Sequence, residues 1–291
     1  MSPEGKRPIG VFDSGIGGLS VLAALRAQLP REDFVYFADT GHAPYGERSE
    51  AYVVQRTRAV ATGLIEQERI KALVVACNTA TAAAIHVLRA ELPGFPLVGV
   101  EPALKPAVAA SRTGRIAVLA TRGTVTSRKF ALLRDAFAAQ ADFSVVACDG
   151  LASAIEAGEP GPVAALCARY VAQAGRFGTA PGEIDTLVLG CTHYPFAADV
   201  LRRHTGADVR FIETGVPVAL QTRRLLAAAG TLAPVAGEDD GDAMDPGAGA
   251  GAGAGVDVGI AARAGTVRLT GTGDPATLRA AAARWLGGPI G

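Results

Sequence analysis

The chain alternates short apolar runs with longer segments in which apolar residues recur every three or four positions. The short runs are typical of buried strands, and the longer segments are typical of amphipathic helices. Strands and helices that alternate in this way form βα units around a parallel sheet, so we predict an α/β fold. The predicted strands are 8–12, 34–38, 72–76, 97–100, 116–120, 143–147, 186–190 and 209–212, and helices are predicted at 19–29, 52–68 and 79–92.

Three of the early strands resemble three later strands in the same order. The matched segments are IGVFDSG at Ile9 with IAVLATRG at Ile116, FVYFADTG at Phe34 with FSVVACDG at Phe143, and ALVVACNT at Ala72 with TLVLGCTH at Thr186. Their offsets of 107, 109 and 114 residues are nearly constant, which indicates a repeated α/β unit. We predict two pseudo-symmetric domains, 1–102 plus 215–291 and 103–214, each a mostly parallel sheet flanked by helices. The active site would lie in the cleft between them.

Residues 235–257 are of a different kind, acidic at first and then an alternating Gly-Ala tract. This composition gives a core nothing apolar to bury, and glycine-rich tracts behave as flexible chain. We interpret the segment as a disordered surface insertion in the first domain. A strand at 265–272 and a helix at 275–286 are predicted beyond it.

The overall charge balance excludes some classes of partner. Lys+Arg 28 match Asp+Glu 28, so no net charge attracts nucleic acid or an anionic membrane. The sequence has neither an apolar signal core nor a run of about 18 apolar residues, and we expect a cytoplasmic protein without membrane contact. Four cysteines without close paired spacing favour reduced thiols over disulfides or a zinc site.

Cys77 and Cys191 stand at matched positions of the repeat, each where a predicted strand ends and a helix begins. Ligands of open α/β sheets bind at such strand ends. Free N–H groups and the helix dipole lower the pKa of a thiol placed there, so we expect a fraction of thiolate. The same N–H groups, together with Asn78, Thr79 and Thr192, are suited to hold a carboxylate.

If the two halves face one another, the two thiols approach one ligand from opposite sides. Inverting a carbon that bears hydrogen needs this arrangement, because one thiolate removes the proton while the other thiol delivers one to the far face. A buried cysteine is usually only a small apolar residue, but the equivalent positions of Cys77 and Cys191 favour a catalytic interpretation. We expect Cys148 and Cys167, which lack this pairing, to lie in the core.

Asp13 and Ser14 follow the first predicted strand, where glycines lead into a helix. The glycine spacing is not G-x-G-x-x-G, so the signal for a dinucleotide site is weak. We expect Asp13 to face the cleft, where it would orient a proton on Cys77 or bind the substrate ammonium. A plain turn or cap role for Asp13 is the alternative.

His193 lies two residues after Cys191, close enough to adjust the proton of that thiol. Glu156, in LASAIEAGE, would anchor His193 from behind. A helix cap for the histidine and an exposed helical position for the glutamate are the alternatives.

Further polar residues follow other predicted strands. Asp39 ends the second strand, and the turn that follows would bring the backbone N–H groups of Tyr45 and Gly46 to the cleft. Thr121 and Thr124 occupy the second half's counterpart of the Asp13 position. They would add hydroxyl donors to the site or serve as ordinary turn residues.

Six motifs, IGVFDSGIGGLSVL, YFADTGHAPYG, VVACNTATAAA, GVEPALKPA, VLATRGTVTS and LVLGCTHYPF, together resemble those of the aspartate/glutamate racemase family and of its glutamate racemases in particular. The resemblance implies two α/β domains with the site between them. It implies racemisation of L-glutamate to D-glutamate without pyridoxal phosphate or metal, as a supply of D-glutamate for peptidoglycan. Glutamate is then the expected partner molecule, and we expect a homodimer.

Matched motif by motif, the resemblance makes Cys77 and Cys191 the acid/base pair, assisted by Asp13 and His193. The substrate-binding residues that it implies are Asp13, Ser14, Tyr45, Gly46, Asn78, Thr79, Thr121, Thr124, Thr192 and His193. Asp39 and Glu156 would support this site from outside. The Gly-Ala insertion has no counterpart in the family pattern, and Ser153 stands where a proline is common.

Three other functions fit parts of the sequence. A pyridoxal-phosphate racemase needs a Schiff-base lysine, for which Lys105 in EPALKPA is the best candidate; its proline-rich setting favours a structural role. A relative that acts on aspartate, hydantoins or malonates would share the two-cysteine scaffold. A non-catalytic amino-acid-binding protein would use the same cleft for sensing.

Overall fold

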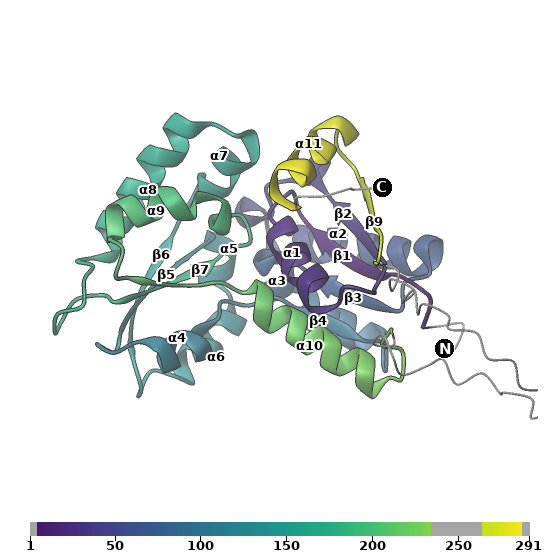
Figure 1. Cartoon of the computed structure of the whole chain (residues 1–291), viewed down its shortest axis with the longest axis horizontal. Coiled ribbons are helices and arrows are strands. Elements are labelled where there is room, and N and C mark those ends of the chain that lie inside the picture. The colour runs from purple at the N-terminus through teal and green to yellow at the C-terminus, as the bar shows by residue number, and fades with distance from the viewer. Residues whose placement is uncertain (1–4, 234–263, 287–291) are drawn as a thin grey trace, which may run out of the picture.

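A computed structural model describes residues 5–233 and 264–286. Figure 1 shows two α/β halves side by side, each built around its own sheet. The insertion predicted at 235–257 lies outside the described residues. Within the part that is described, no helix combines the length and apolar character needed to cross a bilayer.

Among the described residues, the first sheet contains five strands in the order β4-β3-β1-β2-β9. These strands are β1 (Ile9–Asp13), β2 (Phe34–Ala38), β3 (Ala72–Val75), β4 (Leu97–Gly99) and β9 (Val267–Gly271). All of the neighbouring pairs are parallel, with Ile9 opposite both Phe34 and Ala72. The late strand β9 therefore extends a sheet that is otherwise built from the first hundred residues.

The second sheet has the order β6-β5-β7-β8 and is also parallel throughout. Its strands are β5 (Arg115–Ala120), β6 (Asp142–Ala147), β7 (Thr186–Gly190) and β8 (Arg210–Ile212). Read from its other edge, the order β8-β7-β5-β6 matches β4-β3-β1-β2, strand for strand. The predicted α/β fold with two similar, mostly parallel sheets is confirmed.

Helices cover both faces of the first sheet because side chains alternate between the faces along each strand. Val11 packs into the cluster under α1, α10 and α11, whereas Phe12 packs into the cluster under α2 and α3. The helices of this half are α1 (Leu19–Gln28), α2 (Glu50–Glu68), α3 (Asn78–Glu91), α10 (Gly215–Ala228) and α11 (Pro275–Leu286), with short 3-10 turns η1 (Thr40–His42) and η2 (Tyr45–Glu47). Both α10 and α11 pack on α1.

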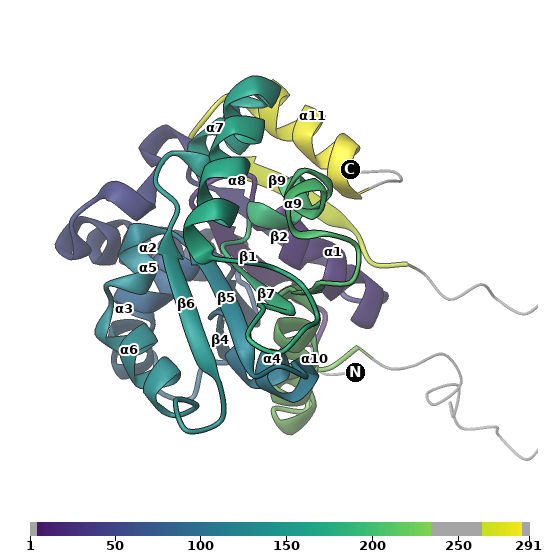
Figure 2. The same ribbon diagram turned by 90° about the vertical axis from the view of Figure 1, so that its left-hand side faces the viewer.

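The second sheet is covered in the same way, as Figure 2 shows from the side of that half. Helices α7, α8 and α9 bury one apolar cluster against it, and α4 and α6 bury another. The helical elements are α4 (Leu104–Ala110), α5 (Arg122–Val125), α6 (Arg128–Asp135), α7 (Leu151–Ala157), α8 (Pro160–Ala174), η3 (Tyr194–Ala197) and α9 (Ala198–Thr205). The chain passes between the halves after β4 and again after β8, and on this basis we propose 1–102 plus 215–291 and 103–214 as the domain boundaries.

Candidate active site

A cavity of about 290 Å³ lies where the carboxyl ends of strands from both sheets meet. The segments that follow β1, β2 and β3 border it from the first half, and those that follow β5, β6 and β7 border it from the second. This is the position at which parallel α/β sheets bind small ligands.

Most of the predicted site residues border this cavity. They are Ser14, Tyr45, Gly46, Cys77, Asn78, Thr79, Thr121, Glu156, Cys191, Thr192 and His193. Asp13, Asp39 and Thr124 are buried outside the cavity wall. This geometry does not support direct contact of Asp13 or Thr124 with a substrate. Each is linked to a residue of the cavity wall by a hydrogen bond, Asp13 to Ser14 and Thr124 to Thr121.

The Cys77 thiol sits at the N-terminus of α3 and is almost fully buried. Its Sγ lies 3.5 Å from Ser14 Oγ and accepts a hydrogen bond from the Ala80 N–H. Burial raises the pKa of Cys77 well above its ordinary value, and the charge of Asp13 adds to the rise. The lowered pKa predicted for this thiol is wrong, because the loss of hydration outweighs the hydroxyl and amide that favour the thiolate.

Asp13 is fully buried behind Ser14. One carboxylate oxygen accepts the Gly18 N–H at 2.6 Å, and the other lies 3.5 Å from the Ser14 hydroxyl. Burial raises the pKa of Asp13 to about 6, although the charge of His193 and the Gly18 amide oppose the rise. Asp13, Ser14 and Cys77 thus form a line along which a proton can pass to or from the first thiol.

The second thiol has a different set of partners. Cys191 Sγ lies 3.8 Å from His193 Nδ1, and His193 Nε2 lies 2.5 Å from Glu156 Oε2. Desolvation lowers the pKa of His193, but the hydrogen bonds to Cys191 and Glu156 outweigh it and raise the pKa well above its usual value. For Glu156 burial acts in the opposite direction and favours a higher pKa, yet the hydrogen bond from His193 lowers the pKa below the ordinary range. An imidazolium and a carboxylate therefore stand behind Cys191.

The first half contacts this histidine directly. The Ile16 N–H donates to both oxygens of Glu156, and Ser20 Oγ donates to the Thr192 carbonyl at 2.9 Å. A Cβ on Gly17 would lie closer than 3.0 Å to three atoms of the His193 ring. The glycines after β1, which resemble a phosphate-binding loop only weakly, instead permit the two halves to approach one another closely.

Asn78 has both of its side-chain polar atoms buried without a hydrogen-bond partner among the described residues. The residue borders the cavity, beside the Thr79 hydroxyl, which lies 2.9 Å from the Thr121 hydroxyl of the other half. An unpaired buried amide costs about 1–3 kcal/mol. Asn78 is therefore a group that a polar ligand would satisfy.

A family model described as Asp/Glu/Hydantoin racemase matches residues 9–222 of this chain. The chain belongs to this racemase family.

Named members of the racemase family resemble the chain over most of its length. The glutamate racemase of Pseudomonas entomophila strain L48 is 50% identical over 225 residues, which cover 77% of this chain and 83% of that protein. The crystal structure of a glutamate racemase isoform from Bacillus anthracis superposes with a TM-score of 0.78 at 28% identity, covering 98% of this chain and 95% of that one. The Francisella tularensis glutamate racemase, whose structure contains D-glutamate, gives a TM-score of 0.74 at 26% identity, covering 98% and 96%.

Asp39 organises the loop that brings Tyr45 to the racemase cavity. Its carboxylate accepts hydrogen bonds from the Tyr45 hydroxyl, the Arg56 guanidinium and the Thr272 hydroxyl, and His42 Nδ1 lies 3.0 Å away. Burial favours a raised pKa for Asp39, but these donors, with Arg56 first among them, lower it. Asp39 therefore holds the 40–47 turn and ties it to the corner that follows β9.

Several residues of the racemase cavity were not anticipated from the sequence. Arg122 and Asp149 form an exposed ion pair on its wall, and Glu47 borders it from the first half. Cys148 is buried in the core, as predicted, yet it also borders the cavity. The only feature of the sequence that could have indicated them is their position, since Arg122 and Cys148 stand just beyond the ends of β5 and β6.

Proposed function

We propose that this chain interconverts L-glutamate and D-glutamate by a two-base transfer of the α-proton between Cys77 and Cys191. One observation carries the proposal: the two thiols come from equivalent strand ends of the two sheets and border a single cavity. The similarity to named glutamate racemases over most of the chain supports glutamate as the substrate.

In the proposed reaction, Asn78 and the nearby threonine hydroxyls bind the substrate carboxylates, and water is excluded from the cavity. One thiolate breaks the Cα–H bond and becomes a thiol. The resulting carbanion delocalises its charge into the α-carboxylate, where hydrogen-bond donors stabilise it. The opposite thiol then gives its proton to the other face of Cα and is left as the thiolate. The roles of the two cysteines reverse for the other enantiomer.

Each cysteine has its own group for setting its protonation state. In this proposal Asp13 takes the proton of Cys77 through the Ser14 hydroxyl, which lies 3.5 Å from each of them. His193, whose Nδ1 lies 3.8 Å from Cys191 Sγ, exchanges a proton with Cys191. Asp13 and His193 act here as assisting groups, while Ser14, Tyr45, Gly46, Thr79, Thr121 and Thr192 line the substrate site.

We propose that no pyridoxal phosphate takes part. Lys105, the best candidate for a Schiff-base lysine, is exposed on α4 and does not border the cavity. Supply of D-glutamate to peptidoglycan follows from the family resemblance and is part of the proposal. A cytoplasmic location and a homodimeric assembly stay predictions.

A circular-dichroism assay with D- and L-glutamate tests the function. The purified, colourless protein is expected to bring either enantiomer to the racemic mixture without added cofactor. Aspartate, one methylene shorter, should react about tenfold more slowly or worse. In deuterated water, the product of each direction should carry deuterium at Cα. Faster turnover of aspartate, or a requirement for pyridoxal phosphate, would contradict the assignment.

The pH dependence of kcat/KM should reveal Asp13. Since the pKa of Asp13 is raised to about 6, its carboxylate is protonated below that pH and cannot accept the proton of Cys77. We expect kcat/KM to fall on the acid side with a midpoint near pH 6. In Asp13→Asn this acid limb should disappear and the remaining activity should be low at every pH. An unchanged acid limb in the variant would assign it to another group.

A further inference from the structure

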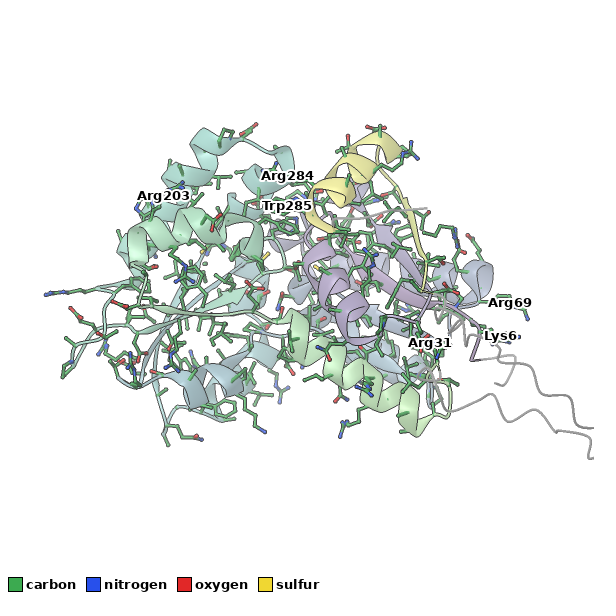
Figure 3. All side chains as sticks on the ribbon, viewed as in Figure 1. Lys6, Arg31, Arg69, Arg203, Arg284 and Trp285 are labelled. Atoms are coloured by element: carbon green, nitrogen blue, oxygen red, sulfur yellow. The ribbon has the colours of Figure 1, made fainter. Side chains whose placement is uncertain are left out.

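An aromatic stack between the two halves involves Phe196, which follows the second cysteine by five residues. Trp285 is the single tryptophan of the chain and stands near the end of α11. Its ring stacks on that of Phe196, with centroids 4.1 Å apart and an interplanar angle of 17°. Figure 3 shows Trp285 and Arg284 at the end of α11 that faces the second half, and the Arg284 guanidinium lies 4.7 Å from the indole centroid.

Phe196 belongs to the same compact turn as the second thiol. Its N–H donates to the His193 carbonyl at 3.0 Å, and the Tyr194 N–H donates to the Cys191 carbonyl at 3.1 Å. The Phe196 ring packs against one core cluster in each half of the molecule. A shift of this ring would therefore be transmitted over one short turn to the His193 side chain.

The surface that holds the turn is continuous on the first half. Helix α11 packs on α1, and α1 carries Ser20, whose hydroxyl donates to the Thr192 carbonyl. The first half therefore contacts the turn at two points, because Trp285 stacks on Phe196 and Ser20 donates a hydrogen bond to Thr192. The two hydrogen-bond contacts of the Cys77 thiol, with the Ser14 hydroxyl and the Ala80 N–H, both come from its own half.

We propose that Trp285 is a positioning residue for Cys191, the second cysteine of the acid/base pair. By stacking on Phe196, it keeps the 191–196 turn in the place where His193 meets both Cys191 and Glu156. Helix α11 thereby takes part in positioning Cys191 through Phe196. This inference rests on the proposed racemase function and adds a residue to it.

The kinetic test compares three variants at the end of α11. Trp285→Ala should lower kcat about tenfold or more, with KM changed less, because a displacement of about 1 Å in a catalytic group costs up to about 100-fold. Trp285→Phe keeps a ring for the stack and should recover most of the rate. The matched control is Leu286→Ala, since Leu286 packs against the same core cluster and should leave kcat near that of the unmodified protein.

A second readout does not depend on turnover. Iodoacetamide alkylation of each cysteine, followed by mass spectrometry, should show a severalfold change in the rate at Cys191 in Trp285→Ala, with Cys77 unaffected. In Phe196→Leu, the emission of the single tryptophan should shift to the red as its stacking partner is lost. Unchanged emission would mean that the stack does not exist in solution and would overturn the proposal.

The outcomes separate the two levels of inference. If the unmodified protein racemises glutamate but Trp285→Ala behaves like Leu286→Ala, or if both thiols change equally, the positioning role is wrong and the proposed function stands. If no racemisation is found while alkylation of Cys191 alone responds to Trp285, the positioning role stands and the proposed function is wrong.

Discussion

Replacing Cys77 or Cys191 by serine is expected to lower glutamate racemisation by about a thousandfold or more in each case. A positioned acid or base contributes about 10²–10⁴-fold, and serine retains the shape of cysteine while its hydroxyl is far harder to deprotonate. Because both directions of the reaction use both thiols, each single substitution should stop interconversion from either enantiomer. Circular dichroism measures the rate, and thermal unfolding verifies that each variant is folded.

The chain offers matched controls for these two substitutions. Cys148 borders the same cavity, and Cys167 is fully buried within α8. Neither has a partner at an equivalent position in the other half, so Cys148→Ser and Cys167→Ser should retain most of the racemisation rate.

The single-cysteine variants should also differ from one another. Each variant keeps one thiol. In deuterated water, that thiol should still exchange the α-hydrogen of the enantiomer whose Cα–H bond points toward it. Deuterium should therefore enter one enantiomer in Cys77→Ser and the opposite enantiomer in Cys191→Ser. Full racemisation by either variant, or exchange of the same enantiomer by both, would exclude the two-base scheme.

Adding one methyl group at Gly17 is expected to lower kcat/KM about 100-fold. The new Cβ would clash with the His193 ring, which Glu156 and Cys191 already hold in place. The ring or the whole second half must then move, and a displacement of about 1 Å near the reacting atoms costs about this factor. The effect should be measured as kcat/KM for both enantiomers.

The control for this glycine is Gly63→Ala in the middle of α2. A Cβ built on Gly63 meets no atom within 4 Å, and alanine favours a helix by about 0.5–1 kcal/mol over glycine. Gly63→Ala should therefore keep the full rate and unfold at the same or a slightly higher temperature. If Gly17→Ala is as active as Gly63→Ala, the close approach of the halves at His193 has no catalytic importance.

Much of the fold could be predicted from local patterns. The predicted strand at 34–38 coincides with β2. The predicted helix at 52–68 differs from α2 only at its start, because Ser49 caps the helix and α2 begins two residues earlier, at Glu50. The equivalence of Ile9 with Ile116 agrees with the central positions of β1 and β5 in two sheets of the same strand order. Such features depend on spacing along the chain, which a sequence displays directly.

The site could be predicted only in part. The sequence predicts that Cys77 and Cys191 lie at strand ends, since apolar runs stop there and polar residues follow. The pKa of Cys77 could not be predicted, because it depends on how completely the surrounding residues exclude water. The distances from Glu156 to His193 and to the Ile16 N–H could not be predicted either, because these residues are far apart along the chain.

The amino-acid sequence by itself determined the kind of elements, their order and the twofold repetition, since periodicity and capping act over a few residues. Only the tertiary structure decided which groups stand behind each thiol, that Asp13 reaches Cys77 through Ser14, and that Trp285 packs beside the turn of Cys191. The physical reason is that burial and hydrogen-bond geometry are set by residues brought together from distant parts of the chain, and both change steeply over a fraction of an ångström.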